Sequence, residues 1–220
     1  MESHDVHLAI EQGDEASLRA MLARDPSRAG ERDARGVSAV MKALYHRRRD
    51  FADLLRSSAP PSDVFEAAAL DDAVRLGTLL RDDRERAKAW SADGGTALHF
   101  AAFFGATESA RLLLQHGADA AVPAPGFGNV APLHSATASR SIAIVRMLLE
   151  RGASVDAVQH GGWTALMSAA HRGDEPLTEL LLDHGADPLK KAEDGRDAVA
   201  MADQGGFGAL ADRLRSAART

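Results

Sequence analysis

The sequence contains no cysteine, and this absence removes several kinds of site at once. Without thiols there are no disulfides, no thiol nucleophile and no cysteine ligands for zinc or iron–sulfur clusters. The 220 residues also lack an apolar run long enough to span a membrane. The first residues do not show the basic segment followed by an apolar segment that marks a secretory signal. We therefore expect a cytoplasmic protein with no membrane association.

Basic charge is also scarce, because 26 Lys and Arg stand against 32 Asp and Glu and the formal net charge is −6. No broad basic stripe is present, which argues against nucleic acid as the main partner. The local exception is the run His46-Arg47-Arg48-Arg49, which we place at a turn between two helices. We favour a solvated loop for this run, and the alternative is a contact for an acidic partner.

What the sequence does contain is a long internal repeat, in which an apolar residue is followed three positions later by Ala. The seven anchors are Val6, Val40, Val64, Leu98, Leu133, Leu166 and Val199. Subtracting successive numbers gives intervals of 34, 24, 34, 35, 33 and 33 residues. A period near 33 residues predicts stacked units, each in contact only with its neighbours.

The clearest units carry a longer common motif. Residues 95–105 read Gly-Thr-Ala-Leu-His-Phe-Ala-Ala-Phe-Phe-Gly, and residues 110–119 read Ala-Arg-Leu-Leu-Leu-Gln-His-Gly-Ala-Asp. Similar segments run over 131–153 and 164–187. These segments resemble ankyrin repeats, and as a stand-alone array the chain is similar to bacterial ankyrin-repeat proteins. The resemblance implies an all-α solenoid of helix-turn-helix units joined by hairpin fingers.

Within each unit the repeated residues have physical roles. Ser38, Ser62, Thr96 and Thr164 can cap the first helix. Gly105 and Gly173 are expected in the turn between the two helices, and Gly117, Gly152 and Gly185 at the end of the second. His99 and His134 occupy the histidine slot of the motif, where we expect hydrogen bonds to the neighbouring unit.

We divide the single domain of residues 1–220 into seven units, at about 5–33, 34–61, 62–90, 91–125, 126–158, 159–192 and 193–216. The interval from Val40 to Val64 is about nine residues short, and Ser57–Ser62 replaces its finger. This omission predicts a notch or kink in the concave face, or a seam between two short arrays. Conversely, residues 121–129 lengthen one finger. Arg140 stands where other units carry the turn glycine, so we expect that turn to be altered.

Aromatic residues are few, and most lie where a partner would bind. The resemblance implies that partners contact the finger tips and the exposed face of the first helix. Of the ten aromatics, six fall on that face. With two neighbouring polar residues they form the predicted partner-binding site: Tyr45, Trp90, Phe103, Phe104, Phe127, Trp163, His171 and Arg172. The alternative is that finger aromatics merely pack against adjacent fingers.

The nine histidines offer little for catalysis or metal binding. His4 and His7 could hold a divalent metal weakly, but an exposed, frayed terminus explains them better. Adjacent carboxylates such as Asp71-Asp72 and Asp82-Asp83 do not face one another across a cleft. No zinc-protease, phosphate-loop or serine-elbow motif is present. We expect no cofactor, no metal site and no enzyme activity.

The sequence therefore predicts a monomeric protein-binding scaffold, serving as an adaptor, inhibitor or assembly factor for a protein partner that it does not identify. Three alternatives remain open. A partner could bind the longer finger at 123–129 instead. The concave face could hold an enzyme site built from histidines and carboxylates. The chain could also be a structural module that associates with itself through the aromatic face.

Overall fold

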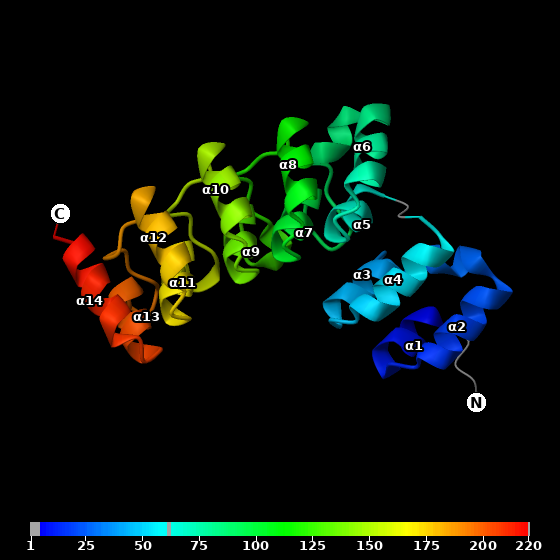
Figure 1. The fold of residues 1–220 in the computed structure, drawn as a ribbon, viewed down its shortest axis with the longest axis horizontal. Coiled ribbons are helices and arrows are strands. Elements are labelled where there is room, and N and C mark those ends of the chain that lie inside the picture. The colour runs from blue at the N-terminus through cyan, green and yellow to red at the C-terminus, as the bar shows by residue number, and fades with distance from the viewer. Residues whose placement is uncertain (1–4, 61–62, 220) are drawn as a thin grey trace.

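The computed structural model describes residues 5–60 and 63–219, which form helix pairs stacked side by side (Figure 1). The helices are α1 (Val6–Gln12), α2 (Glu15–Arg24), α3 (Ala39–Tyr45), α4 (Arg49–Ser58), α5 (Val64–Ala69), α6 (Ala73–Asp82), α7 (Ala97–Phe103), α8 (Thr107–Gln115), α9 (Pro132–Ala138), α10 (Ile142–Glu150), α11 (Ala165–His171), α12 (Glu175–Asp183), α13 (Ala198–Gln204) and α14 (Gly208–Ala217). Short 3-10 turns are η1 (Pro26–Gly30), η2 (Arg84–Lys88), η3 (Pro125–Phe127) and η4 (His160–Gly162). The all-α helix-turn-helix solenoid is confirmed, and each predicted unit range holds one helix pair.

The starts of the first helices follow the capping residues. Ser38 and Thr164 each accept a hydrogen bond from a backbone N–H in the first turn, as expected. At Thr96 the hydroxyl lies 2.8 Å from His99 Nδ1. Ser62 lies outside the described residues, and Asp63 caps α5 by accepting from the N–H groups of Phe65 and Glu66.

The turn between paired helices needs a residue in the left-handed region. Gly105 and Gly173 supply it with φ of +70° and +63°. Arg140 adopts φ of +58° at the corresponding position, so our expectation of an altered turn was wrong. An ion pair of 2.7 Å from Arg140 Nε to the buried carboxylate of Asp174 in the next unit accompanies this conformation.

The histidine slot links neighbouring units. The Nε2 of His99 lies 3.0 Å from the carbonyl of Val130, and the Nε2 of His134 lies 3.0 Å from that of Ala157. Because a carbonyl can only accept, each Nε2 carries the proton and donates. Burial lowers the pKa of both rings. The expected structural role of these histidines is confirmed.

The N-terminal histidines depart from expectation. His7 is buried, with 8% of its surface exposed, so the predicted exposed position was wrong for this residue. Both of its ring nitrogens lack a hydrogen-bond partner within residues 5–60 and 63–219. His4 lies outside the described residues. His7 occupies the slot that His99 and His134 occupy in their units, which explains its burial.

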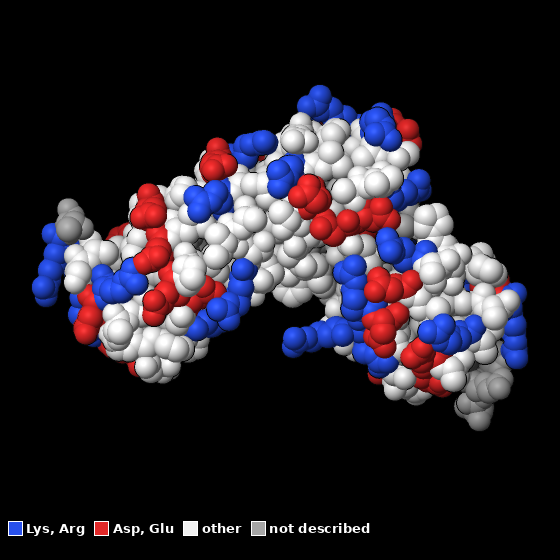
Figure 2. All heavy atoms as spheres, in the orientation of Figure 1, with Lys and Arg blue, Asp and Glu red and all other residues white. Residues whose placement is uncertain are grey.

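The buried apolar residues form two clusters that divide near the short interval. The smaller cluster runs from Val6 to Leu55 and adds Ala69, Leu70 and Phe100, whereas the larger one runs from Val64 to Leu214. We name α1–α4 the N-terminal lobe and α5–α14 the C-terminal lobe. Figure 1 shows the helices of the N-terminal lobe turned relative to those of the C-terminal lobe. The kink predicted at the short interval is present, and the surface is hollowed between the two ends of the molecule (Figure 2).

The omitted finger brings together two fingers that would otherwise be separated. Isolated β-bridges close the fingers at 32–38, 90–96 and 124–130. A Cβ added to Gly36 would lie 3.0 Å from the Cβ of Ala92, so the first two of these fingers touch. The Tyr45 hydroxyl donates to Asp93, and Arg32 pairs with Asp63. The bend is therefore closed by direct contacts between units that are not consecutive.

Candidate protein-binding surface

Four of the predicted aromatic residues converge at the bend. Tyr45 ends α3, Phe103 ends α7, Phe104 follows it, and Phe127 lies in η3. The Tyr45 and Phe104 ring centroids are 6.2 Å apart, and the Phe103 and Phe104 rings meet edge to face at 5.1 Å. The exposed fractions of Tyr45, Phe103 and Phe127 are 40%, 50% and 38%. Residues from three units thus present apolar rings on one surface.

The rings of Tyr45, Phe103 and Phe127 border a cavity of about 220 Å³, which we name the aromatic slot. Its lining consists of Tyr45, His99, Phe100, Phe103, Phe127, Val130 and Ser135. Phe100 is buried beneath it and meets the Phe127 ring edge to face at 6.3 Å. The floor is therefore held by the core, while the rim remains open to solvent.

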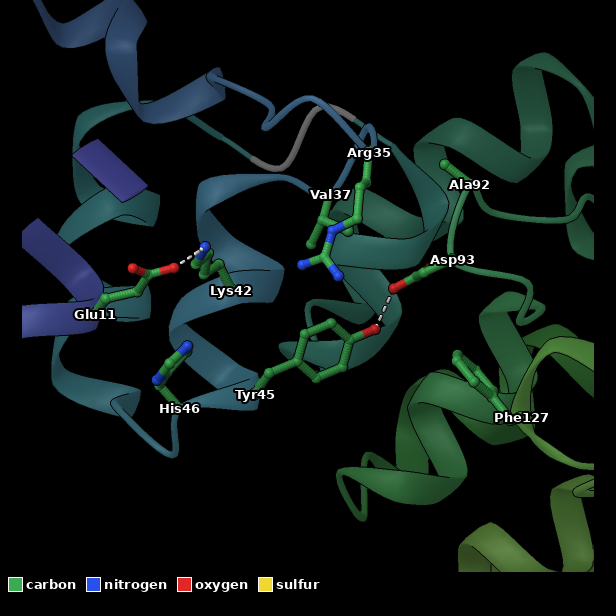
Figure 3. A pocket seen from close by; sticks show the side chains of 9 residues that line it. All are labelled: Glu11, Arg35, Val37, Lys42, Tyr45, His46, Ala92, Asp93 and Phe127. Carbon is green, nitrogen blue, oxygen red and sulfur yellow. Dashed lines mark hydrogen bonds and ion pairs between the residues drawn. The ribbon is translucent and has the colours of Figure 1, made fainter. Parts of the chain in front are cut away.

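Two wider and more polar hollows adjoin the slot. One, of about 490 Å³, is lined by Glu11, Arg35, Val37, Lys42, Tyr45, His46, Ala92, Asp93 and Phe127 (Figure 3). The other, of about 520 Å³, is lined by Leu44, Tyr45, Arg47, Arg49, Phe103, Phe104 and Ala138. Tyr45 lines all three hollows, so they adjoin one another at the bend, and we refer to them together as the depression at the bend.

The hydroxyl of Tyr45 is fixed by the opposite finger. Figure 3 shows the ring reaching across from α3 toward Asp93, to which the hydroxyl donates. Burial and the Asp93 carboxylate raise the pKa of Tyr45, so the phenol keeps its proton at neutral pH. Asp93 also accepts from the Ser91 hydroxyl at 2.5 Å. This network sets the direction of the Tyr45 ring and hence one wall of the slot.

The remaining predicted site residues do not line the slot. Trp90 is 47% exposed and stands beside His99 at 6.2 Å between ring centroids, and it lines a small pocket at the bend that shares Asp93 and Phe100 with the hollows described above. Trp163 is half-buried against the core and meets His171 edge to face at 5.9 Å. Arg172 donates to the carbonyl of Thr137 at 2.7 Å. The predicted set is thus divided between the bend and a second group further along the chain.

Residues that sequence reasoning missed complete the surface at the bend. Phe100 carries no signal of its own, because it sits between motif positions that are buried in every unit. Asp93 and Arg35 become relevant only because the omitted finger brings their fingers together. No repeat period encodes that contact.

Across residues 5–60 and 63–219, no group of three or more His, Asp or Glu side chains is placed to hold a metal ion. Among those residues there is also no helix with the length and hydrophobicity needed to cross a membrane.

Helix pairs stacked in one direction, with fingers along one edge, define a helical-repeat protein. Residues 64–159 and 128–192 match the family described as ankyrin repeats (3 copies), and the chain therefore belongs to the ankyrin-repeat family. The matched ranges begin at residue 64, which is also where the larger core cluster begins.

Several curated proteins are similar to parts of the chain. The B-cell lymphoma 3 protein homolog of Mus musculus is 41% identical over 95 residues, which is 43% of this chain and 21% of that protein. The neurogenic locus notch homolog protein 1 of Danio rerio is 31% identical over 141 residues, 64% of this chain and 5% of that protein. Its Xenopus tropicalis counterpart is 32% identical over 134 residues, 60% of this chain and 5% of that protein.

The aligned part of the chain thus spans about a fifth of the first relative and a twentieth of the other two. Ankyrin repeats are in general protein–protein interaction modules.

Proposed function

We propose that this chain is a protein-binding scaffold, acting as an adaptor, inhibitor or assembly factor, that holds its partner through the aromatic-rich concave face. The observation that carries the proposal is the exposure of Tyr45, Phe103 and Phe127 around one slot. Clustered exposed aromatics mark interaction surfaces, and Tyr and Trp dominate binding hot spots. Trp90, Phe104, Trp163, His171 and Arg172 extend the proposed face on either side.

Further features of this proposal concern how the scaffold works. It acts in the cytoplasm as a monomer, without catalysis, a cofactor or nucleic acid. The net charge of −6 supports the last point, because a nucleic-acid surface needs an excess of Lys and Arg. A rigid stack with a fixed slot also limits the conformational cost of binding.

Site-specific photo-crosslinking tests this proposal. A photoreactive phenylalanine analogue placed at Phe103 is compared with the same analogue at Val74, which is 84% exposed on the outer helix α6. The position at Phe103 is expected to crosslink a defined protein in cells, whereas the position at Val74 is not. Equal crosslinking from both positions would contradict the proposed face.

A third position, Trp163, tests whether the proposed face extends along the array. The analogue at Trp163 is expected to crosslink the same protein if the partner spans the array. Crosslinking from Phe103 to a second copy of this chain would replace the scaffold by the self-associating module. Size-exclusion chromatography with light scattering would show that outcome independently.

A further inference from the structure

The depression at the bend carries an excess of positive charge on an acidic protein. Its two wider hollows are lined by the cations Arg35, Lys42, Arg47 and Arg49, against the carboxylates of Glu11 and Asp93. The whole chain has a net charge of −6. Figure 2 shows Lys and Arg side chains along the edge of the N-terminal lobe that borders the hollow. The surface around the slot is thus opposite in sign to the molecule as a whole.

The two carboxylates at this surface are already engaged. Glu11 pairs with Lys42, and Asp93 accepts hydrogen bonds from Tyr45 and Ser91. These contacts neutralise or occupy the acidic groups from within the protein. Lys42 is neutralised in the same pair, and Arg49 lies 3.4 Å from Asp53, so Arg35 and Arg47 are the cations of this surface that are left to attract a negative group.

The arginines, in contrast, remain accessible. Arg35 is 80% exposed at the side chain, and among residues 5–60 and 63–219 its one ion pair is to Asp33, at 3.6 Å. Arg47 is exposed and makes no ion pair within the part of the chain that the structure describes. The two side chains line different hollows, which share Phe127 and Phe103, respectively, with the aromatic slot. Long arginine side chains at such positions can pair with a carboxylate through two hydrogen bonds.

The slot itself has the size for a side chain. Its volume of about 220 Å³ is below the roughly 300–1,000 Å³ of small-molecule pockets. Its walls are mainly aromatic rings, which favour a bulky apolar group over a polar one. The surroundings therefore combine an apolar anchor point with positive charge in the two adjoining hollows.

We propose that the aromatic slot binds an acidic segment of the partner protein, with one bulky apolar side chain in the slot and flanking carboxylates paired with Arg35 and Arg47. This inference rests on the proposed function and specifies the chemistry of the partner. Within the run from His46 to Arg49 it assigns Arg47 to partner contact, which is the alternative that the sequence left open for that run. Charge complementarity of this kind raises association rates and rejects basic competitors.

Selection from a random library of 12-residue peptides displayed on phage tests the inference directly. Peptides selected on the full chain are expected to carry Asp or Glu on both sides of an aromatic or large aliphatic residue. Selected peptides without that pattern would overturn the inference. A library that yields no binder at all would also overturn it, because a preformed slot should accept a short segment.

Two variants then locate the binding of a selected peptide. Phe103→Ala is expected to weaken the Kd roughly 30-fold, as removal of a hot-spot side chain does. Arg35→Glu combined with Arg47→Glu is expected to weaken it about 10-fold or more at low salt, with a smaller effect as ionic strength rises. The matched control is Arg111→Glu combined with Arg146→Glu, at two exposed positions on α8 and α10, and it should leave the Kd unchanged. Circular dichroism verifies that each variant is folded.

Three further outcomes separate this inference from the proposed function and from binding of nucleic acid. A protein that crosslinks at Phe103 but binds equally well to the Arg35→Glu/Arg47→Glu variant would refute the acidic segment and leave the scaffold standing. A single-stranded DNA oligonucleotide that displaces the peptide with higher affinity would replace the acidic segment by nucleic acid. Peptide binding that depends on the arginines, without any crosslinked partner, would leave the slot chemistry standing and refute the scaffold.

Discussion

Truncation of Leu55 should destabilise one lobe and spare the other. Leu55 lies in α4, is fully buried and belongs to the smaller core cluster. Leu→Ala at such a site costs about 3 kcal/mol, from lost transfer energy and the cavity that remains. In a stacked array, contacts are made mainly between neighbours, so the loss should stay with the lobe that contains the cavity.

Hydrogen exchange measured by mass spectrometry gives the assay. A loss of about 3 kcal/mol corresponds to roughly 100-fold faster exchange for amides that open together with α4. We expect that increase over α1–α4 in the Leu55→Ala variant, with little change over α9–α14. Helices α5 and α7 should respond in between, because Ala69 of α5 and Phe100 of α7 belong to the smaller cluster.

A matched variant in the other cluster provides the control. Leu148 is fully buried in α10, and Leu148→Ala should accelerate exchange over α8–α12 without affecting α1–α4. If either variant accelerates exchange equally along the whole chain, the two clusters unfold as one unit. The division of the core between α4 and α5 would then have no energetic meaning.

Two further perturbations follow from residues described above. Burial lowers the pKa of His99 and His134 from 6.5, so the unfolded chain binds more protons than the folded chain below that pH. The free energy of unfolding, measured with urea, should therefore have its full value above pH 6.5 and fall as the pH is lowered from there toward 5. The fall should be at most about 1.4 kcal/mol per pH unit for each ring. A profile that stays flat or rises would refute the neutral, buried rings, and His99→Gln should flatten it. Arg47→Gly should raise the thermal midpoint by roughly 2–4 °C in circular dichroism, since glycine removes up to about 1 kcal/mol of strain at φ of +58°. Arg140 has the same φ of +58°, but Arg140→Gly should not raise the thermal midpoint, because it removes the ion pair of the buried Asp174 carboxylate.

The repeat in the sequence is sufficient to place the helix pairs. The anchors from Val6 to Val199 mark the first helix of each pair, and Ser38 and Thr164 begin their helices as predicted. Arg140 was misjudged because local preference disfavours a left-handed arginine, whereas contacts in the folded chain impose that conformation. His7 was misjudged because proximity to the terminus was given more weight than its place in the histidine slot.

The candidate surface was harder to predict than the fold. The register of the repeat placed Tyr45, Phe103 and Phe127 on the exposed face, and their exposure agrees with that placement. It could not show that they meet at one slot, because Tyr45 and Asp93 are 48 residues apart and belong to units that are not consecutive. Which of the aromatic residues contact a partner stays a prediction.

A rotation of the C-terminal lobe relative to the N-terminal lobe would be centred where the finger is omitted, between α4 and α5, and we call this point the fulcrum. Four spacings of about 10 Å separate α5 from α13, so the arm beyond the fulcrum is roughly 40 Å long. A rotation of about 10° at the fulcrum would move α13 by roughly 7 Å. The contact between Tyr45 and Asp93 acts close to the fulcrum, where a displacement of a fraction of an ångström corresponds to several ångströms at the far end. The contacts at the bend, from Tyr45 to Asp93 and from Arg32 to Asp63, are therefore small in extent but set the width of the opening between the two ends of the array.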